Sequence, residues 1–303
     1  MRVIEDIREL IGHTPMIRLN HMGYGPDACV VAKLELFNPG GSVKDRMGLA
    51  LVRDAEERGL LRPGSTILEA TAGNAGIGIA LAAMGRGYRV VFAVPEKFSE
   101  EKQVIMRALG AEIVHTPREK GMQGAFEKIA ELEKQVSHPV RLSQFANPAN
   151  PRVHFETTGP EIFEAMEGEV GTLVAGAGSG GTLTGVARYL KEKKPDVVCV
   201  MADPVGSTMG GGEAGCYAIE GIGNTFLPET MDMSLVDEVI KVRDDEAVAE
   251  VRRLAAKEGI LAGSSSGAAL AAARRVAARK NSGPIVVLLP DRGDRYFSKH
   301  LFG

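Results

Sequence analysis

Short, mainly apolar segments alternate with longer amphipathic segments along most of the chain. The short segments have the length of strands and lie at 30–35, 65–70, 88–95, 111–117, 171–177, 197–204, 236–242 and 284–290. Strands without a polar face are typical of parallel sheets that helices cover on both sides. The alternation therefore predicts an α/β fold with mostly parallel sheets, each enclosed between helical layers.

The longer segments carry the signals of helix ends. Ser99 stands before Glu100 and Glu101 at one start, while Gly59 and Gly110 close two helical patterns. The patterns predict helices at 46–59, 99–110, 183–194 and 269–280. The chain of 303 residues is long enough for two domains. The Asn- and Pro-rich stretch 147–151 predicts a hinge between two such α/β units.

Composition argues against several classes of function. The formal charge is only −3, so nothing favours nucleic acid or an anionic membrane as a partner. Cys29, Cys199 and Cys216 are few and widely spaced, which fits a reduced compartment and, with the scattered histidines, gives no zinc-ligand spacing. The N-terminus carries acids where a secretory signal needs an apolar run, and no apolar stretch has the length of a membrane span. We therefore expect a cytoplasmic globular protein without a metal site.

A glycine-rich loop, "GAGSGGT" at 176–182, joins a predicted strand to a predicted helix. Backbone N–H groups at a helix start, with no side chains in the way, form a cradle for phosphate. Gly176, Gly178 and Gly181 also match GxGxxG, and Asp203 follows at the end of the next strand. This is close to a dinucleotide fingerprint, so an NAD-dependent oxidoreductase is one interpretation. A tight turn without a ligand is another.

Three further loops fall where strands of such sheets end and ligands bind. "EATAGNAGIG" at 69–78 offers backbone donors at the start of a helix after Gly76, which suit a carboxylate or serve only a turn. "GSSSGAA" at 263–269 places serines before a helix, where they are often N-caps. "EGIGNTF" at 220–226 has glycines that let the backbone approach a ligand closely.

Lys44 stands in "NPGGSVKDRM", where a helix is expected to begin. The positive end of the helix dipole favours the neutral amine, and a lysine of lowered pKa forms a Schiff base with an aldehyde. A solvated surface lysine is the simpler interpretation of this residue alone. A phosphate cradle, a carboxylate loop and a serine loop in the same chain favour pyridoxal phosphate, which uses all of them together with the lysine.

At these residues the sequence resembles the cysteine synthase and cystathionine β-synthase family of fold-type II pyridoxal-phosphate enzymes. The resemblance covers nearly the whole chain, from "IGHTPMIRL" (11–19) through "NPGGSVKDR", "EATAGNAGIG", "GSGGT" and "EGIG" to "GSSSGA" and "DRGDRYFS". It implies two three-layer αβα domains. The smaller, mobile domain would comprise 35–147, and the larger one 1–34 with 148–303.

The resemblance also implies roles for individual residues. Lys44 would be the Schiff-base lysine, Asn74 the partner of the cofactor's 3-hydroxyl, and Ser265 the partner of its pyridine nitrogen. The cofactor phosphate would lie on Gly178, Ser179, Gly180, Gly181 and Thr182. The substrate would be held by Thr71, Ala72, Gly73, Asn74 and Ala75 together with Gln144 and Gly221.

A neutral serine at the pyridine nitrogen makes the ring a weaker electron sink than an aspartate would, which favours β-elimination and β-replacement. Lys44, once released, is placed to remove the α-proton. The resemblance to bare catalytic cores of the family makes cysteine synthase, acting on O-acetylserine with sulfide, our first interpretation. The alternative is cystathionine β-synthase, acting on O-acetylserine or serine with homocysteine. Serine/threonine dehydratase and the NAD enzyme are remoter, and a non-catalytic sensor would be expected to have lost the lysine or the cofactor loop.

The chain departs from typical cysteine synthases in two loops. Ala72 and Ala75 stand where those enzymes have hydroxyl side chains, so carboxylate binding would depend on backbone N–H groups, Thr71 and Gln144. Glu220 stands where they usually have glutamine, and it would either pair with the ammonium of homocysteine or be a solvated acid. The resemblance further implies a homodimer. It also suggests the C-terminal tail of serine acetyltransferase as a partner, against which the altered carboxylate loop argues.

Overall fold

The computed structural model describes residues 3–71, 73–96, 99–279 and 283–303. Its larger sheet has the strand order β1-β2-β10-β7-β8-β9, and β1 is its antiparallel edge strand. The remaining described neighbours in this sheet pair in parallel. The strands are β1 (Met16–Arg18), β2 (Val30–Leu34), β7 (Thr172–Gly176), β8 (Val198–Pro204), β9 (Glu238–Val242) and β10 (Ile285–Leu289).

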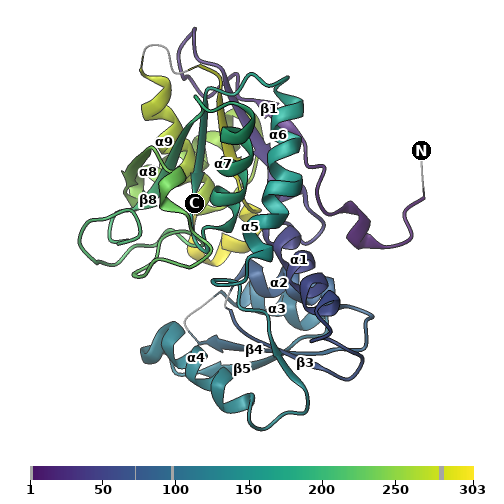
Figure 1. Cartoon of the computed structure of the whole chain (residues 1–303). Coiled ribbons are helices and arrows are strands. Elements are labelled where there is room, and N and C mark those ends of the chain that lie inside the picture. Colours follow the sequence, from purple (N-terminus) through teal and green to yellow (C-terminus); the bar gives the residue numbers. More distant parts are fainter. Residues whose placement is uncertain (1–2, 72, 97–98, 280–282) are drawn as a thin grey trace.

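A second, parallel sheet has the order β5-β4-β3-β6 and occupies the lower part of Figure 1. Its strands are β3 (Thr66–Ala70), β4 (Arg89–Pro95), β5 (Glu112–Thr116) and β6 (Pro139–Arg141). The structure confirms the predicted α/β class with mostly parallel sheets, and all eight predicted strands are present. β1 and β6 were not predicted, because three residues are too few to show a period.

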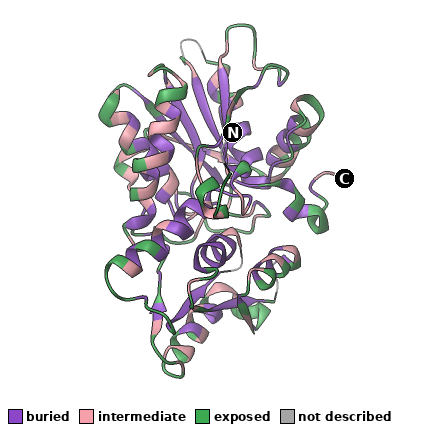
Figure 2. Cartoon of the chain, turned by 90° about the vertical axis from the view of Figure 1, so that its right-hand side faces the viewer, coloured by how far each residue is buried: buried purple, intermediate pink, exposed green. Residues whose placement is uncertain are grey.

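Helices cover both faces of each sheet. In the larger sheet, one set of alternate residues packs on α9 and the other on α6 and α7. In the smaller sheet, α1 and α2 cover one face and α4 the other. Figure 2 shows the result, with buried strands inside helices whose outer faces are exposed. The helices are α1 (Lys44–Glu57), α2 (Asn74–Ala83), α3 (Glu100–Ala108), α4 (Gly121–Leu132), α5 (Ala149–Val153), α6 (Gly159–Ala165), α7 (Gly181–Lys193), α8 (Asp244–Glu258) and α9 (Ser264–Ala277).

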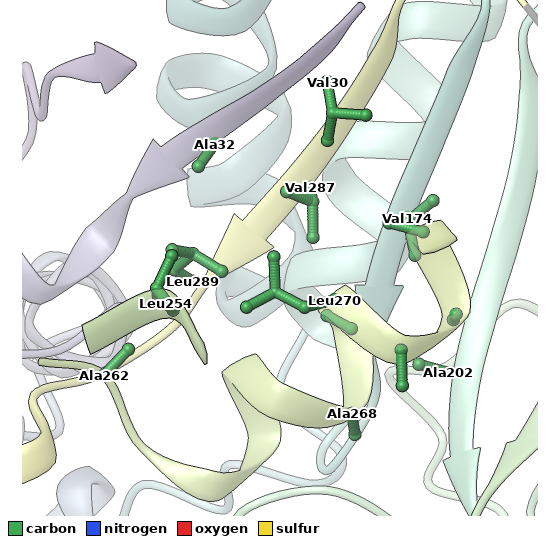
Figure 3. Close-up of a cluster of buried hydrophobic side chains, with 14 of the residues drawn as sticks. Val30, Ala32, Val174, Ala202, Leu254, Ala262, Ala268, Leu270, Val287 and Leu289 are labelled. Atoms are coloured by element: carbon green, nitrogen blue, oxygen red, sulfur yellow. The ribbon is translucent and has the colours of Figure 1, made fainter. Parts of the chain in front are cut away.

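The alanine-rich helix α9 lies in the core of the larger sheet. Ala268 and Leu270 of the helix belong to one buried cluster with Val174 and Val287 of the strands (Figure 3), and all four are fully buried. Methyl side chains let the helix pack closely on the sheet, and the three serines of its first turn are buried as well.

Three helix starts differ from the sequence expectation. α1 begins at Lys44, two residues before the predicted 46, and α2 begins at Asn74 and not after Gly76. Gly263 is the N-cap of α9, so the expectation that serines precede this helix is wrong: they form its first turn. The differences arise because these starts are held by tertiary packing and not by side-chain caps, which none of the three helices has.

Helices α1 and α2 cross at two glycines. A Cβ on Gly48 would lie 2.2 Å from the carbonyl carbon of Gly78, and a Cβ on Gly78 would lie 2.2 Å from the carbonyl oxygen of Lys44. The two helices therefore touch backbone to backbone, which brings their first residues, Lys44 and Asn74, to the same region. The predicted hinge 147–151 overlaps α5, which contacts both α1 and α7. The division into a smaller and a larger domain stays a prediction.

Candidate active site

A cavity of about 810 Å³ opens where β3, β7 and β10 end. This is the edge at which parallel sheets bind ligands. Ala72 lies outside the described residues. Every other predicted site residue except Gly181 lines the cavity: Lys44, Thr71, Gly73, Asn74, Ala75, Gln144, Gly178, Ser179, Gly180, Thr182, Gly221 and Ser265.

Lys44 faces the phosphate cradle across this cavity. Its Nζ lies 3.4 Å from Oγ of Ser179, to which it donates a hydrogen bond. Burial lowers the pKa of Lys44 to about 8, although the carboxylate of Asp291 acts in the opposite direction. Roughly a tenth of the amine is therefore uncharged at pH 7, far more than for an ordinary lysine, and the neutral amine is the nucleophilic form.

The cradle itself depends on glycine at particular positions. Gly180 has a φ of +83° and is the N-cap of α7, and a Cβ on Gly178 would lie 2.3 Å from the carbonyl oxygen of Gly221. Gly181 does not line the cavity, and only glycine fits there, because a Cβ would lie 2.0 Å from Oδ1 of Asn150. The first backbone N–H groups of a helix have no partner inside it, and Gly180 and Thr182 at the start of α7 line the cavity, an arrangement that suits phosphate.

A buried histidine supports the far end of the cradle. His154, in the π-helical turn η4 (His154–Thr158), lies with Nε2 3.2 Å from Oγ1 of Thr182 and Nδ1 2.9 Å from Oγ1 of Thr158. Burial lowers the pKa of His154 to about 3, so the ring is neutral. It fixes the side chain of Thr182 without adding a charge beside the cradle.

The dinucleotide interpretation required an acid at the end of β8. Asp203 is buried, and its Oδ2 accepts hydrogen bonds from Nζ of Lys241 at 2.6 Å and from the backbone of Gly210 at 3.1 Å. It does not line the cavity. The carboxylate that would bind a ribose is therefore used inside the protein, and the glycine loop faces Lys44 instead.

The loop that carries Gln144 is held by a buried acid of β3. Oε2 of Glu69 accepts a hydrogen bond from the backbone of Ser143 at 3.0 Å. Burial raises the pKa of Glu69 to about 7, while backbone hydrogen bonds from Ser143, Gln144 and Leu142 act against that rise. Asn150 completes the support, because its Nδ2 donates to the carbonyl oxygen of Gln144 at 2.8 Å and to Oγ of Ser179 at 3.0 Å.

Sequence reasoning missed the contribution of the segment after β10. Asp291 and Tyr296 both line the cavity, and the tyrosine hydroxyl donates to Oδ2 of Asp291 at 2.6 Å. Burial raises the pKa of both groups. The signal was present, since Asp291 follows a strand just as the four glycine- and serine-rich loops do.

Charged side chains stand at one side of the same cavity. Glu220 accepts a hydrogen bond from Nζ of Lys102 at 2.6 Å, and Nζ of Lys299 lies 4.0 Å from its other oxygen. Lys102 is buried and lies over the ring of Tyr296, 4.2 Å from the centroid. Glu220 is therefore ion-paired, and the expectation that it is merely a solvated acid is wrong.

The residues present fit pyridoxal phosphate. The open start of α7 suits the phosphate, and the amine of Lys44 lies opposite it. Ser265, in the first turn of α9, and Asn74, at the start of α2, add a hydroxyl and an amide to the wall. Within the described ranges, no three His, Cys, Asp or Glu residues gather as a metal site would need. Fold and site together define a pyridoxal-phosphate-dependent enzyme.

Comparison with known proteins agrees. The family model described as "Pyridoxal-phosphate dependent enzyme" matches residues 7–291, and the chain belongs to this family. An O-acetylserine-dependent cystathionine β-synthase of Bacillus subtilis is 51% identical over 303 residues, covering 100% of this chain and 99% of the relative. Cysteine synthase A of Escherichia coli is 45% identical over 315 residues, covering 99% and 96%. The crystal structure of an O-acetylserine-dependent cystathionine β-synthase from Helicobacter pylori superposes with a TM-score of 0.95 at 41% identity over 100% of both chains.

These findings confirm the predicted family, cofactor and enzyme class. The chain is a pyridoxal-phosphate enzyme of the cysteine synthase and cystathionine β-synthase family with the fold-type II architecture. No helix in the described part of the chain is long and apolar enough to cross a membrane.

Proposed function

We propose that this enzyme replaces the acetate of O-acetylserine with a sulfur nucleophile. The observation that supports this most is that Lys44 and the cradle of α7 face each other across a cavity that also contains the start of α2. The reaction of an amino-acid substrate needs all three: an amine that acts as base, an anchor for the cofactor, and hydrogen-bond donors for the carboxylate of the substrate. Pyridoxal phosphate, when bound, supplies the electron sink that stabilises charge at the α-carbon.

The chain's own residues then have separate tasks. Lys44 holds the cofactor. Once its amine is released from the cofactor, it takes the α-proton of the substrate, and a pKa of about 8 suits this base at neutral pH. Ser265 offers a neutral partner for the ring nitrogen, which keeps the electron sink weak and favours loss of the β-substituent. Thr71 and the backbone N–H groups at the start of α2 hold the substrate carboxylate, with Gln144 opposite. Ala72 retains the role that the family resemblance implies.

The nucleophile separates the two candidate functions. In the sequence, the resemblance of the chain to bare catalytic cores of the family favours sulfide as the nucleophile. Glu220 with Lys102 and Lys299 supports homocysteine instead, because a zwitterion can exchange its ammonium and carboxylate into an existing ion pair. Sulfide has neither an ammonium nor a carboxylate group with which to use this ion pair. We therefore place homocysteine first, and cysteine synthesis from sulfide is the second candidate.

One steady-state experiment compares the two. The purified enzyme receives O-acetylserine or serine with either sulfide or homocysteine, and cysteine, cystathionine and pyruvate are quantified. We expect cystathionine from O-acetylserine with the highest kcat/KM. Glu220→Gln should raise the KM for homocysteine about tenfold, the size expected for losing one charge-assisted contact, and leave the sulfide reaction unchanged.

Glu192→Gln is the matched control, because this exposed acid of α7 lies outside the cavity wall. An equal loss with both nucleophiles in Glu220→Gln would refute the role of Glu220. A higher kcat/KM with sulfide would return cysteine synthase to first place, and pyruvate as main product would indicate a dehydratase.

The family resemblance also supports a homodimer that works in the cytoplasm on small molecules, without nucleic acid or membrane partners. The three cysteines are unpaired, as a reduced compartment would leave them. Light scattering of the purified protein as it leaves a size-exclusion column tests the dimer. A binding assay with a peptide of the serine acetyltransferase C-terminal tail tests that enzyme as a partner, and we expect no binding.

A further inference from the structure

The side-chain amide of Asn74 is held at both ends by residues more than 200 positions away. Its Nδ2 donates to Oδ2 of Asp291 at 2.6 Å, and its Oδ1 accepts from the guanidinium of Arg295. Asn74 belongs to the smaller sheet's α2, whereas Asp291 and Arg295 follow β10 of the larger sheet. The two contacts therefore connect the halves of the cavity.

The holding residues are themselves fixed. Asp291 is buried, with a second hydrogen bond from the hydroxyl of Tyr296 at 2.6 Å. Arg295 is buried and also donates to the carbonyl oxygen of Gly40, in the turn before Lys44. Glycine at position 41 makes room for it, because a Cβ there would lie 2.5 Å from Nη2 of Arg295. This explains the second glycine of the pair that precedes Lys44, while a Cβ on the first, Gly40, would lie 2.5 Å from Oδ1 of Asp45.

An amide has two ends of nearly equal shape and opposite hydrogen-bonding character. An acceptor, Asp291, on one side and a donor, Arg295, on the other leave only one orientation in which both contacts form. In that orientation Nδ2 keeps one hydrogen that neither contact uses. Asn74 lines the cavity, so this hydrogen is the donor that the residue can offer to a bound group.

We propose that Asp291 and Arg295 are positioning residues, which hold the Asn74 amide so that its remaining N–H donates to the bound cofactor. The inference rests on the proposed role of Asn74 beside the cofactor. It does not depend on which nucleophile the enzyme uses. Without the two partners, these contacts no longer decide which end of the amide, Nδ2 or Oδ1, faces the bound cofactor.

The test combines cofactor spectra with a double-mutant cycle. Arg295→Met keeps an apolar stem and removes the donors, while Asp291→Ala removes the acceptor. Both are made in the native chain and in an Asn74→Ala background. The readouts are the position of the visible absorption band of the bound cofactor and the steady-state constants for O-acetylserine. Asp294→Ala is the control, since this exposed acid of the same segment does not line the cavity and leaves both contacts of Asn74 in place.

In the native background, we expect each substitution to move the band and to lower kcat about tenfold, within the coupling known for residues of one hydrogen-bonded network. In the Asn74→Ala background, both substitutions should change the band and kcat much less, because only their effects on Lys44 and on the turn at Gly40 remain. Asp294→Ala should leave the band in place. Effects of equal size in both backgrounds would overturn the proposal, as would an Asn74→Ala band identical to that of the native enzyme.

If Asp291→Ala does not fold, Arg295→Met decides by the same criteria. The band is measured without substrate, so the proposal can be judged even if O-acetylserine is not turned over. In that case the proposed function fails and the role of the two positioning residues is still tested.

Discussion

Replacing Gly78 by alanine tests whether backbone contact between α1 and α2 positions Lys44. The added methyl would lie 2.2 Å from the carbonyl oxygen of Lys44. That is roughly 1 Å or more inside an ordinary van der Waals contact. The obstacle is backbone, which cannot rotate away as a side chain could. The helices must therefore separate, and Lys44 moves with α1.

Helix propensity and packing predict opposite effects of this substitution on the free energy of unfolding. Alanine in place of glycine inside a helix stabilises the folded chain by about 1 kcal/mol. Overpacking costs about 1–3 kcal/mol, and the upper end applies where backbone meets backbone. The net expectation is a loss of about 2 kcal/mol, or a Tm lower by about 4 °C for a chain of this size. A displacement of about 1 Å at a catalytic group lowers kcat/KM by about a hundredfold.

The assay pairs thermal unfolding with turnover of O-acetylserine. Gly73→Ala is the stability control, because a Cβ there meets nothing within 4 Å and its φ is −136°. Its Tm should match that of the native chain. A Gly78→Ala variant with raised Tm and full activity would show that propensity outweighs the contact, and the argument about the crossing would be wrong.

Three further predictions concern single side chains. Lys44→Ala should abolish turnover and leave the far-ultraviolet circular dichroism unchanged, whereas normal turnover would refute the central assignment. Because burial lowers the pKa of Lys44 to about 8, the rate at which cofactor-free enzyme binds pyridoxal phosphate, followed by absorbance, should rise with pH through about 8 and level off above it. A rate that is flat across this range would contradict the role of the amine. Glu69, with its pKa raised to about 7 from 4.5, contributes stability that is complete below 4.5 and is lost as pH rises through 7. Urea unfolding of Glu69→Gln should therefore show a smaller loss of stability between those pH values than the native chain, and identical pH profiles would exclude this contribution.

The sequence alone determined the fold class and most of the cavity wall. Short, mainly apolar segments such as 65–70 and 171–177 have a local pattern typical of a buried strand, and the structure places β3 and β7 there. The glycine-rich loops that follow these strands are equally local signals, so the residue pattern alone is enough to locate the cradle and the loop that leads into α2. Less periodic elements were missed. α8, for example, begins with three acids and buries only four residues of its fifteen, which gives a weak apolar pattern.

Only the tertiary structure decided which distant residues meet at the cavity. Nothing in "DRGDRYFS" reveals that Asp291 and Arg295 lie beside Asn74, 217 and 221 positions earlier in the chain. The charge of Glu220 was visible in the sequence, but its pairing with Lys102 was not. The physical reason is range: periodicity and turn chemistry act over a few neighbouring residues. Contacts between side chains of separate elements depend on how two sheets and their helices pack, as where Gly48 and Gly78 let α1 and α2 touch.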